Sequence, residues 1–438
     1  MRVPVIMHVR TARRLTFWFI GLILSGCLVG ILVPAGLGWD FANFYDAGRR
    51  VAAGQIADIY DTRSLIAGEA PQGQMRFWGT PISAVLYAPM SALSPEAALI
   101  AFKVQNVVAY AAALGLLFAF CQRFLKPGTP ARWEFAALFT FLCLIYQPFW
   151  TVFRVGGQTT ATVFLLLVGG LVLHTGGRLW GSAACVVLAT LIKPALAPAL
   201  LFLLCVSGLR YLRNTVVILG VVGLLSLVML GWPVHQAFLN RVLTEGQAKF
   251  PWYHNSSLFI LTEALRSWLP APTAGDSLVT TATYALKAIV LATFGYLIVK
   301  SRPLGWPDAA RRHFHFMLAI AFFLLWSPTL WEHYLAVLFP LLAYIVASRE
   351  QFSGRARALV SVIFLLSLGQ NLILMDWLRG RFAFDTAVTL TGIALLKSGP
   401  LWLTLILLWR HYPDVFRSYS VPAWGSIPEV APSDRRAS

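Results

Sequence analysis

The sequence predicts an all-α polytopic membrane protein, built as a bundle of about 10 to 12 transmembrane helices. Of its 438 residues, 58% are hydrophobic and only 12% are charged, a balance far too apolar for a soluble fold. Several apolar runs also reach the roughly 20 residues that a helix needs to cross a bilayer. The chain is therefore expected to lie mostly within a membrane.

The apolar runs predict the spans in chain order. The first run is too long for the core of a signal peptide, and no small-residue cleavage site follows it, so we expect a retained span. Short connections separate most of the later runs. The predicted spans cover about 15–37, 97–120, 134–152, 158–174, 181–206, 214–232, 281–299, 314–326, 331–347, 358–375 and 386–409.

The net charge of +17 is concentrated before the first span and in short connections between spans. An excess of Lys and Arg in short loops is typical of the cytoplasmic face of a membrane protein. The basicity is therefore topological, and no nucleic-acid partner is expected. The residues concerned are Arg2, Arg10, Arg13, Arg14, Arg123, Lys126, Arg132, Arg210, Arg213, Lys300, Arg302, Arg311, Arg312, Arg349, Arg355 and Arg357.

The run 181–206 differs from the others because Lys193-Pro194 and Pro198 interrupt it. Proline breaks the hydrogen-bond ladder of a helix, and a charge prefers the membrane interface. Arginines flank the run on both sides, which places both of its ends in the cytoplasm. We therefore expect a hairpin of two half-length helices that reaches outward and returns.

This topology predicts one integral domain at 15–410, preceded by a cytoplasmic basic segment at 1–14 and followed by a cytoplasmic, disordered tail at 411–438. The long loops, about 38–96 and 233–280, then fall on the outer side of the membrane. The expected location is the inner or plasma membrane, multi-pass, with the site facing the periplasm or outer side.

The first outer loop opens with a carboxylate and an aromatic amphipathic segment, Trp39 to Gly48, which suggests chemistry at the membrane surface. Together with later segments on the same face, it resembles glycosyltransferase family 87 over roughly 15–410. The matching segments are Asp40-Phe41-x-x-Phe44-Tyr45-x-Ala47-Gly48 with Gly54 and Tyr60-Asp61, Gly156-Gly157-Gln158, Leu191-Ile192-Lys193-Pro194, His254-Asn255-Ser256-Ser257-Leu258, and Ser327-Pro328-x-x-Trp331-x-His333-Tyr334.

The resemblance implies the GT-C membrane fold, with outer-face loops forming the site. It also implies transfer of a sugar, mannose in several members, from a polyprenyl-phosphate donor to an envelope glycolipid or glycan acceptor. The partners are then the lipid-linked sugar, the acceptor and membrane lipids. The sequence contains no Asp-x-Asp pair, Walker loop, dinucleotide fingerprint or Cys/His cluster, so we expect no cofactor and no metal.

Asp40 is the candidate catalytic base, because a carboxylate at the membrane boundary is partly desolvated and its pKa rises toward the working pH. In the resemblance, Asp40 matches the acidic residue that opens the first outer loop and serves as base. The alternative is that Asp40 only caps a helix that starts at Phe41.

Lys193, Arg154 and His333 are the candidate groups for the donor phosphate. A lysine inside an apolar run needs an anionic partner or water, and a lipid phosphate supplies one. Snorkelling of Lys193 to the interface is the alternative, as is a packing role for His333. Arg154 is the second cation expected at this level, and a histidine can donate to phosphate.

Four further residues are candidates for contacts with the sugar or the acceptor. Gln158 can donate to hydroxyl groups, Tyr45 can stack on a sugar or belong to an interfacial aromatic belt, and Asn255 lies in the second long loop. Glu332 can also hold His333 in the required protonation state. The competing function is a secondary transporter or flippase of lipid-linked sugars, which typically has broken helices in both halves.

Overall fold

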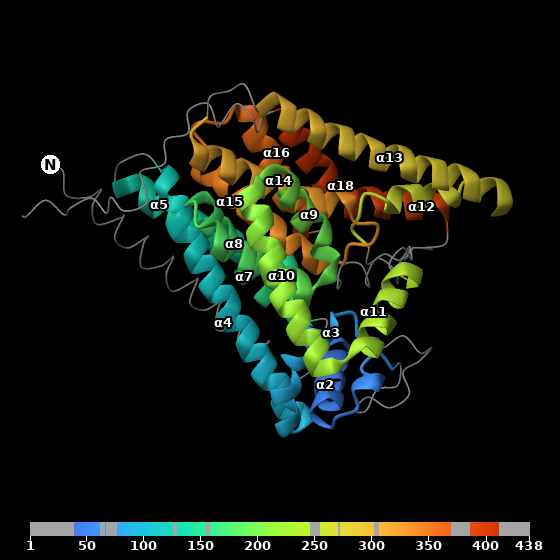
Figure 1. The fold of residues 1–438 in the computed structure, drawn as a ribbon. Helices are drawn as coiled ribbons and strands as arrows, with labels where there is room; N and C mark the ends of the chain where they lie inside the picture. Colours follow the sequence, from blue (N-terminus) through green and yellow to red (C-terminus); the bar gives the residue numbers. More distant parts are fainter. Residues whose placement is uncertain are drawn as a thin grey trace, which may run out of the picture.

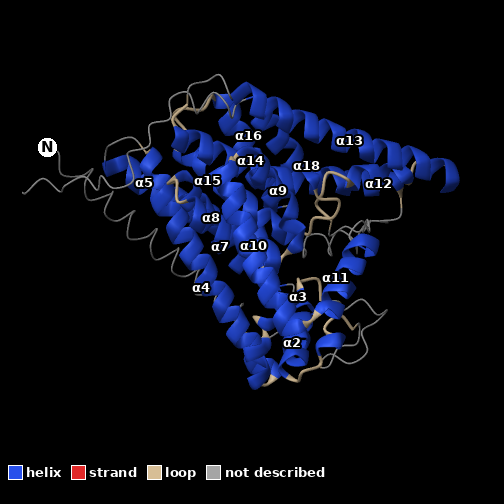
Figure 2. Ribbon diagram, in the orientation of Figure 1, coloured by secondary structure: helices blue, strands red, loops and turns tan. Residues whose placement is uncertain are grey.

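The computed structural model describes residues 39–61, 66, 77–125, 129–154, 158–245, 255–269, 272–301, 306–368 and 386–410. The predicted first span at 15–37, the basic segment 1–14 and the tail 411–438 lie outside the described residues. The described part of the chain contains helices, turns and one isolated β-bridge, and no β-strand (Figure 2). The all-α prediction is therefore confirmed for these residues.

The helices follow the predicted apolar runs closely in order. Between them lie the short 3-10 helices η1 (Ile56–Asp58), η3 (Ala88–Ala92), η4 (Gln122–Phe124), η5 (Pro194–Leu196) and η7 (Glu332–Leu338). The α-helices are α2 (Trp39–Ala52), α3 (Pro81–Val85), α4 (Pro95–Cys121), α5 (Thr129–Ile145), α6 (Gln147–Arg154), α7 (Thr160–Thr175), α8 (Leu179–Ile192), α9 (Ala197–Val206), α10 (Leu209–Leu230), α11 (Trp232–Glu245), α12 (Ile260–Arg266), α13 (Pro272–Ser301), α14 (Asp308–Trp326), α15 (Phe339–Ala347), α16 (Gly354–Leu368) and α18 (Ala387–Arg410).

Among the described residues, four helices are long and apolar enough to cross a membrane: Pro95–Phe124, Leu209–Leu230, Ser277–Ser301 and Ala387–Arg410. A bent pair of helices can make a fifth span. Other predicted spans appear as apolar helices of 10–17 residues, such as Thr160–Thr175 and Leu179–Ile192. At 1.5 Å per residue, such helices are shorter than the roughly 30 Å hydrocarbon core. The described helices thus fit a helical membrane protein, and the number of 10 to 12 spans stays a prediction.

The predicted span 134–152 appears as a bent pair of helices rather than as one straight helix. The helices α5 and α6 meet at Tyr146, where the axis bends by 48°. Pro148 causes the break because it has no N–H to donate to the carbonyl of Leu144. The Trp150 side chain donates to that carbonyl instead, with 2.7 Å between Nε1 and O.

The predicted hairpin at 181–206 is confirmed by the position of His174 at the end of α7. Its two ring nitrogens lie 3.3 Å from the hydroxyl of Ser182 and 3.3 Å from that of Ser207. Ser182 is at the start of α8 and Ser207 follows the end of α9. Both ends of the hairpin therefore lie together, and its tip, at Lys193-Pro194, points to the other end of the bundle.

The basic connections also gather at one end of the bundle. Arg312, at the start of α14, donates to the carbonyl of Thr175 at 3.2 Å, and Arg349 lies 2.9 Å from Glu134. Tyr344 packs on Phe124 of η4, which directly follows α4. The prediction that these loops share one face is therefore confirmed for the described residues.

The opposite end carries a small lobe made of α2, η1, α3 and η3, at the narrow end of the molecule in Figure 1. Its own apolar cluster includes Phe41, Tyr45 and Phe77 and joins the ends of α4 and α10 through Phe102 and Leu230. Gly48 is required there, since a Cβ at this position would lie 2.4 Å from the Tyr87 backbone. This close approach seats α2 on η3.

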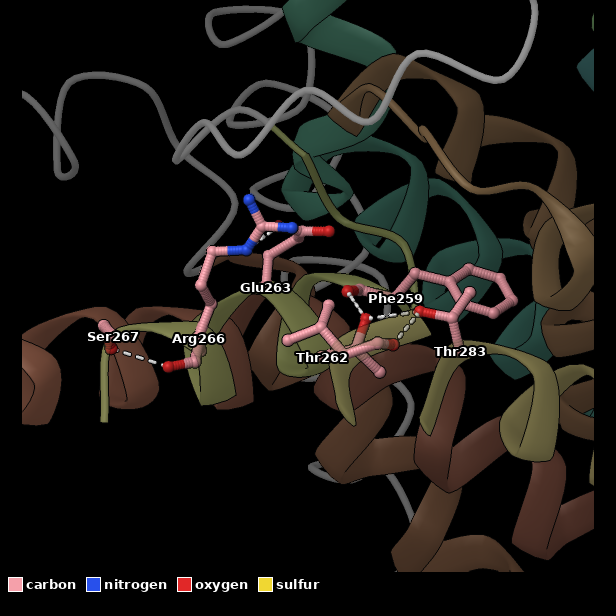
Figure 3. Close-up of polar contacts among 8 residues, drawn as sticks. Phe259, Thr262, Glu263, Arg266, Ser267 and Thr283 are labelled. Atoms are coloured by element: carbon pink, nitrogen blue, oxygen red, sulfur yellow. Dashed lines mark hydrogen bonds and ion pairs between the residues drawn. The ribbon is translucent and has the colours of Figure 1, made fainter. Parts of the chain in front are cut away.

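Within the second long loop predicted at 233–280, the segment after Asn255 is anchored by α12. Figure 3 shows Thr262 of α12 and Thr283 of α13 pointing toward one another, and their hydroxyl oxygens are 3.2 Å apart. The Thr262 hydroxyl also donates to the carbonyl of Phe259 at 2.7 Å, while Glu263 and Arg266 form an ion pair of 3.7 Å along the same helix. The chain next to Asn255 is thereby fixed to α13.

Candidate functional site

The candidate site begins at the N-terminus of α2. The helix starts at Trp39, so Asp40 is its second residue rather than a cap that precedes Phe41. The carboxylate of Asp40 lies within reach of the Gln158 side chain and of the positive charge of Lys193. The sequence-predicted base therefore lies beside two other sequence-predicted site residues, although more than 100 residues separate it from each of them.

Lys193 occupies the tip of the α8–α9 hairpin, where the helix breaks before Pro194. Its side chain is buried, and its ammonium donates to the Thr160 hydroxyl at 2.9 Å and to the side-chain amide oxygen Oε1 of Gln158 at 3.5 Å. It also lies 3.9 Å from the ring centroid of Tyr334, a cation–π contact. These contacts hold the cation in the interior of the protein.

His333 completes the cluster from η7. Its Nε2 lies 3.2 Å from the Lys193 ammonium. An ammonium has no acceptor, so Nε2 accepts from Lys193 and the ring proton resides on Nδ1. Asp40, Gln158, Lys193 and His333 thus converge from α2, the start of α7, the hairpin tip and η7.

The local backbone gives this cluster a positive character. The N-termini of α2 and α7 both lie at it, because Asp40 is in the first turn of α2 and Thr160 is the first residue of α7. A helix N-terminus exposes unpaired N–H groups and favours anions. Together with Lys193, these termini suit the binding of a phosphate.

The environment of Asp40 raises the pKa of its carboxyl above the ordinary value of 3.8. The main cause is burial, which disfavours the charged form. The hydrogen bond from Gln158 and the positive charge of Lys193 act in the opposite direction and lower the pKa in part. A carboxylate with a raised pKa is a better proton acceptor near neutral pH.

Replacement of Gln158 by Leu should move the acid limb of the pH–rate profile to higher pH. The variant removes a hydrogen bond that favours the ionised carboxylate, so the pKa of Asp40 rises further and the base form is lost earlier as the pH falls. The measurement is kcat/KM of purified enzyme across pH 4 to 8. An acid limb that stays in place or moves to lower pH would contradict the proposed contact between Gln158 and Asp40.

Asn255 lies near this cluster but joins two loops. Its Oδ1 accepts from the backbone N–H groups of Ser257 and Leu330, each at 3.0 Å, and its Nδ2 donates to the carbonyl of Pro328 at 3.3 Å. Asn255 also forms the isolated β-bridge with Trp331. The geometry supports a role in positioning the segment that carries His333, and its predicted sugar contact stays a prediction.

Two other predicted residues point elsewhere. The Tyr45 side chain is buried in the apolar cluster of the small lobe, and its hydroxyl donates to the carbonyl of Leu93 at 2.8 Å. Glu332, next to His333, is paired with Lys397 of α18, with 2.7 Å between Oε1 and Nζ. The side chain of Arg154, at the end of α6, lies outside the described residues.

Three residues of this region were not among the predicted site residues, although Tyr334 stands in one of the segments that carry the resemblance. Thr160 and Tyr334 contact Lys193 directly and lie within two residues of positions that the sequence singled out. Lys397 has the same signal as Lys193, a lysine inside an apolar run. A search of every apolar run for an isolated lysine would therefore have found Lys397.

The family comparison covers more than half of the chain. A model of Glycosyltransferase family 87 matches residues 77–328, a stretch that contains Gln158, Lys193 and Asn255. No curated protein matches the chain. Asp40 and His333 fall outside the matched stretch, and the structure brings them to Gln158 and Lys193 inside it. The chain belongs to glycosyltransferase family 87 and is a membrane glycosyltransferase.

Proposed function

We propose that this enzyme transfers a sugar, mannose, from a polyprenyl-phosphate donor to an envelope glycolipid or glycan by an inverting single displacement. The observation that carries the proposal is the contact cluster of Asp40, Gln158 and Lys193. Gln158 thus lies between a base and a cation for phosphate, which are the two groups that the transfer requires.

In the proposed step, the acceptor hydroxyl oxygen attacks the anomeric carbon of the donor sugar. The bond between that carbon and the phosphate oxygen breaks, and the bonding electrons leave with the polyprenyl phosphate. Asp40 takes the hydroxyl proton, while Lys193 faces the charge that grows on the leaving phosphate. Attack opposite to the leaving group inverts the anomeric centre.

His333 and Tyr334 have positioning roles in this proposal. The imidazole Nε2 and the face of the Tyr334 ring both hold the Lys193 ammonium in place. The imidazole Nδ1–H remains as a donor. His333 and Tyr334 thus keep the Lys193 ammonium in place before the donor binds. Electrostatic catalysis requires this preorganisation.

The proposal places the enzyme in the inner or plasma membrane with the site on the outer side. The support is the separation between the two ends of the bundle. The basic connections lie at one end, and the cluster of Asp40 and Lys193 lies at the other. By the positive-inside rule, the basic end faces the cytoplasm.

The experiment that tests the proposal is replacement of Lys193 by Ala. A charge-assisted contact is worth roughly 1.5 to 3 kcal/mol, so turnover or donor affinity should fall by about 10- to 150-fold while acceptor affinity changes little. Lys193→Arg should restore part of the loss because it keeps the charge with a different geometry. The assay uses purified protein, synthetic polyprenyl phosphomannose and a direct count of glycosylated product.

The same assay distinguishes transfer from transport, because flipping alone forms no glycosidic bond. Arg210→Ala, at the basic end of the bundle, is the matched control for loss of one cation and should keep full activity. Wild-type protein that moves the lipid-linked sugar across a liposome without forming product would favour the transporter. Equal losses in Lys193→Ala and Arg210→Ala would remove Lys193 from the site.

A further inference from the structure

The helix α4 buries three polar side chains on one face. Lys103, Asn106 and Tyr110 lie three and four residues apart, which places them on the same side of the helix. Their exposed fractions are 6%, 0% and 6%. Among the residues that the structure describes, Nδ2 and Oδ1 of Asn106 have no hydrogen-bond partner, and the same holds for the Tyr110 hydroxyl.

This face lies at the level of the candidate site. One turn before Asn106, the Phe102 ring is 5.7 Å from that of Phe41, the neighbour of Asp40. One turn after it, the Tyr110 ring is 5.7 Å from that of Phe164, one turn beyond Thr160 on α7. The residues on either side of Asn106 thus pack against α2, which carries Asp40, and against α7, whose Thr160 contacts Lys193.

A buried amide with nothing to bind is costly. Leaving one polar group unpaired in the interior costs about 1–3 kcal/mol, and leucine of nearly the same size would avoid that cost. Buried polar groups of this kind in a membrane protein commonly mark a substrate pathway. An unpaired side chain with both a donor and an acceptor is therefore explained by a ligand that supplies both.

We propose that Asn106 binds hydroxyl groups of the sugar carried by the donor, with Nδ2 donating to one hydroxyl and Oδ1 accepting from another. Lys103, one turn toward the small lobe, supplies a second donor. This inference rests on the proposed function and extends it from the phosphate to the sugar.

The chemistry of the amide favours a sugar over the other parts of the donor. An isoprenoid chain offers no hydrogen bond to either amide atom. A phosphate offers only acceptors and would leave Oδ1 unpaired, whereas a hydroxyl group both donates and accepts. Asn106 therefore matches the sugar, and Lys193 matches the phosphate.

The test compares two lipids, polyprenyl phosphomannose and polyprenyl phosphate without sugar, by their binding to purified wild-type and Asn106→Leu protein. We expect Asn106→Leu to bind the sugar-bearing lipid about 10- to 100-fold more weakly, because a buried sugar hydroxyl loses its partner. Affinity for polyprenyl phosphate should stay within about threefold of the wild-type value, because this lipid carries no sugar that residue 106 could contact. Because the amide has no partner among the described residues, the thermal midpoint should equal or exceed that of wild type.

Gln105→Leu is the matched control, because it makes the same change of amide to leucine on the adjacent, exposed face of α4. It should leave both affinities unchanged. Lys103→Met is the second variant and should also weaken binding of the sugar-bearing lipid selectively. It keeps the test open if Asn106→Leu does not fold.

Three results would overturn the inference. They are equal weakening of both lipids, unchanged binding of both in Asn106→Leu and Lys103→Met, and a lower thermal midpoint that accounts for the loss. If these results occur while wild-type enzyme still transfers mannose, the proposed function stands and only the role of Asn106 falls. If wild-type protein binds neither lipid, both the role of Asn106 and the proposed function are refuted.

Discussion

Asp40→Asn should remove most of the transfer activity and leave the protein folded and inserted in the membrane. The amide keeps the size of the carboxylate and its ability to hydrogen-bond, but it cannot accept a proton as a base. A general base contributes about 100- to 10,000-fold to a rate. The measurement is product formed by purified variant and wild type under saturating donor and acceptor.

Asp58→Asn is the matched control, because Asp58 is an exposed aspartate of the same small lobe, on η1. Its activity should equal that of wild type. Activity of Asp40→Asn within about threefold of wild type would exclude Asp40 as the base, since the expected contribution is at least 100-fold. The thermal midpoint shows whether the variants are folded, and both variants should have the same midpoint as wild type.

Lys397→Met should destabilise the protein strongly. The Glu332–Lys397 ion pair is buried, with side chains exposed by 3% and 0%, and 2.7 Å separates the charged atoms. Removing one partner leaves a buried carboxylate without its cation, which costs about 3–5 kcal/mol. The free energy of unfolding in mixed micelles, measured by SDS titration, gives the change directly.

The matched control is Arg349→Met, which removes one partner of the exposed pair with Glu134. Exposed pairs contribute about 0–1 kcal/mol, so the loss should be small. The double variant Glu332→Gln with Lys397→Met should recover most of the stability of wild type, because no buried charge remains. A loss in Lys397→Met no larger than in Arg349→Met would show that the buried pair adds little.

Most of the candidate site was predictable from the sequence because polar chemistry is rare in this chain. A charged or polar residue in an apolar run must have a partner, and the topology placed Asp40, Gln158, Lys193 and His333 on one face of the membrane. The structure brings these four side chains together. The topology could not set their distances, which depend on how the hairpin and η7 pack.

The limits of the sequence appear in the spans and in the ion pair. A run such as 134–152 reads as one helix because hydropathy does not register one proline, yet Pro148 bends it by 48°. Glu332 and Lys397 pair across 65 positions. A single sequence holds no information on such a distant contact. Hydropathy therefore predicts that a segment is buried, but it does not determine whether the segment crosses the membrane.

The hairpin of α8 and α9 also determines the end of the bundle from which the later helices start. Because it returns to the end where it began, α10 starts on the side where α8 starts. A straightened segment would add one crossing and invert every later helix, so that His333 would face the opposite compartment from Asp40. The break at Lys193-Pro194 is therefore as necessary for the assembly of the site as its reactive groups, because it brings the chain back to the end of the bundle from which α8 starts.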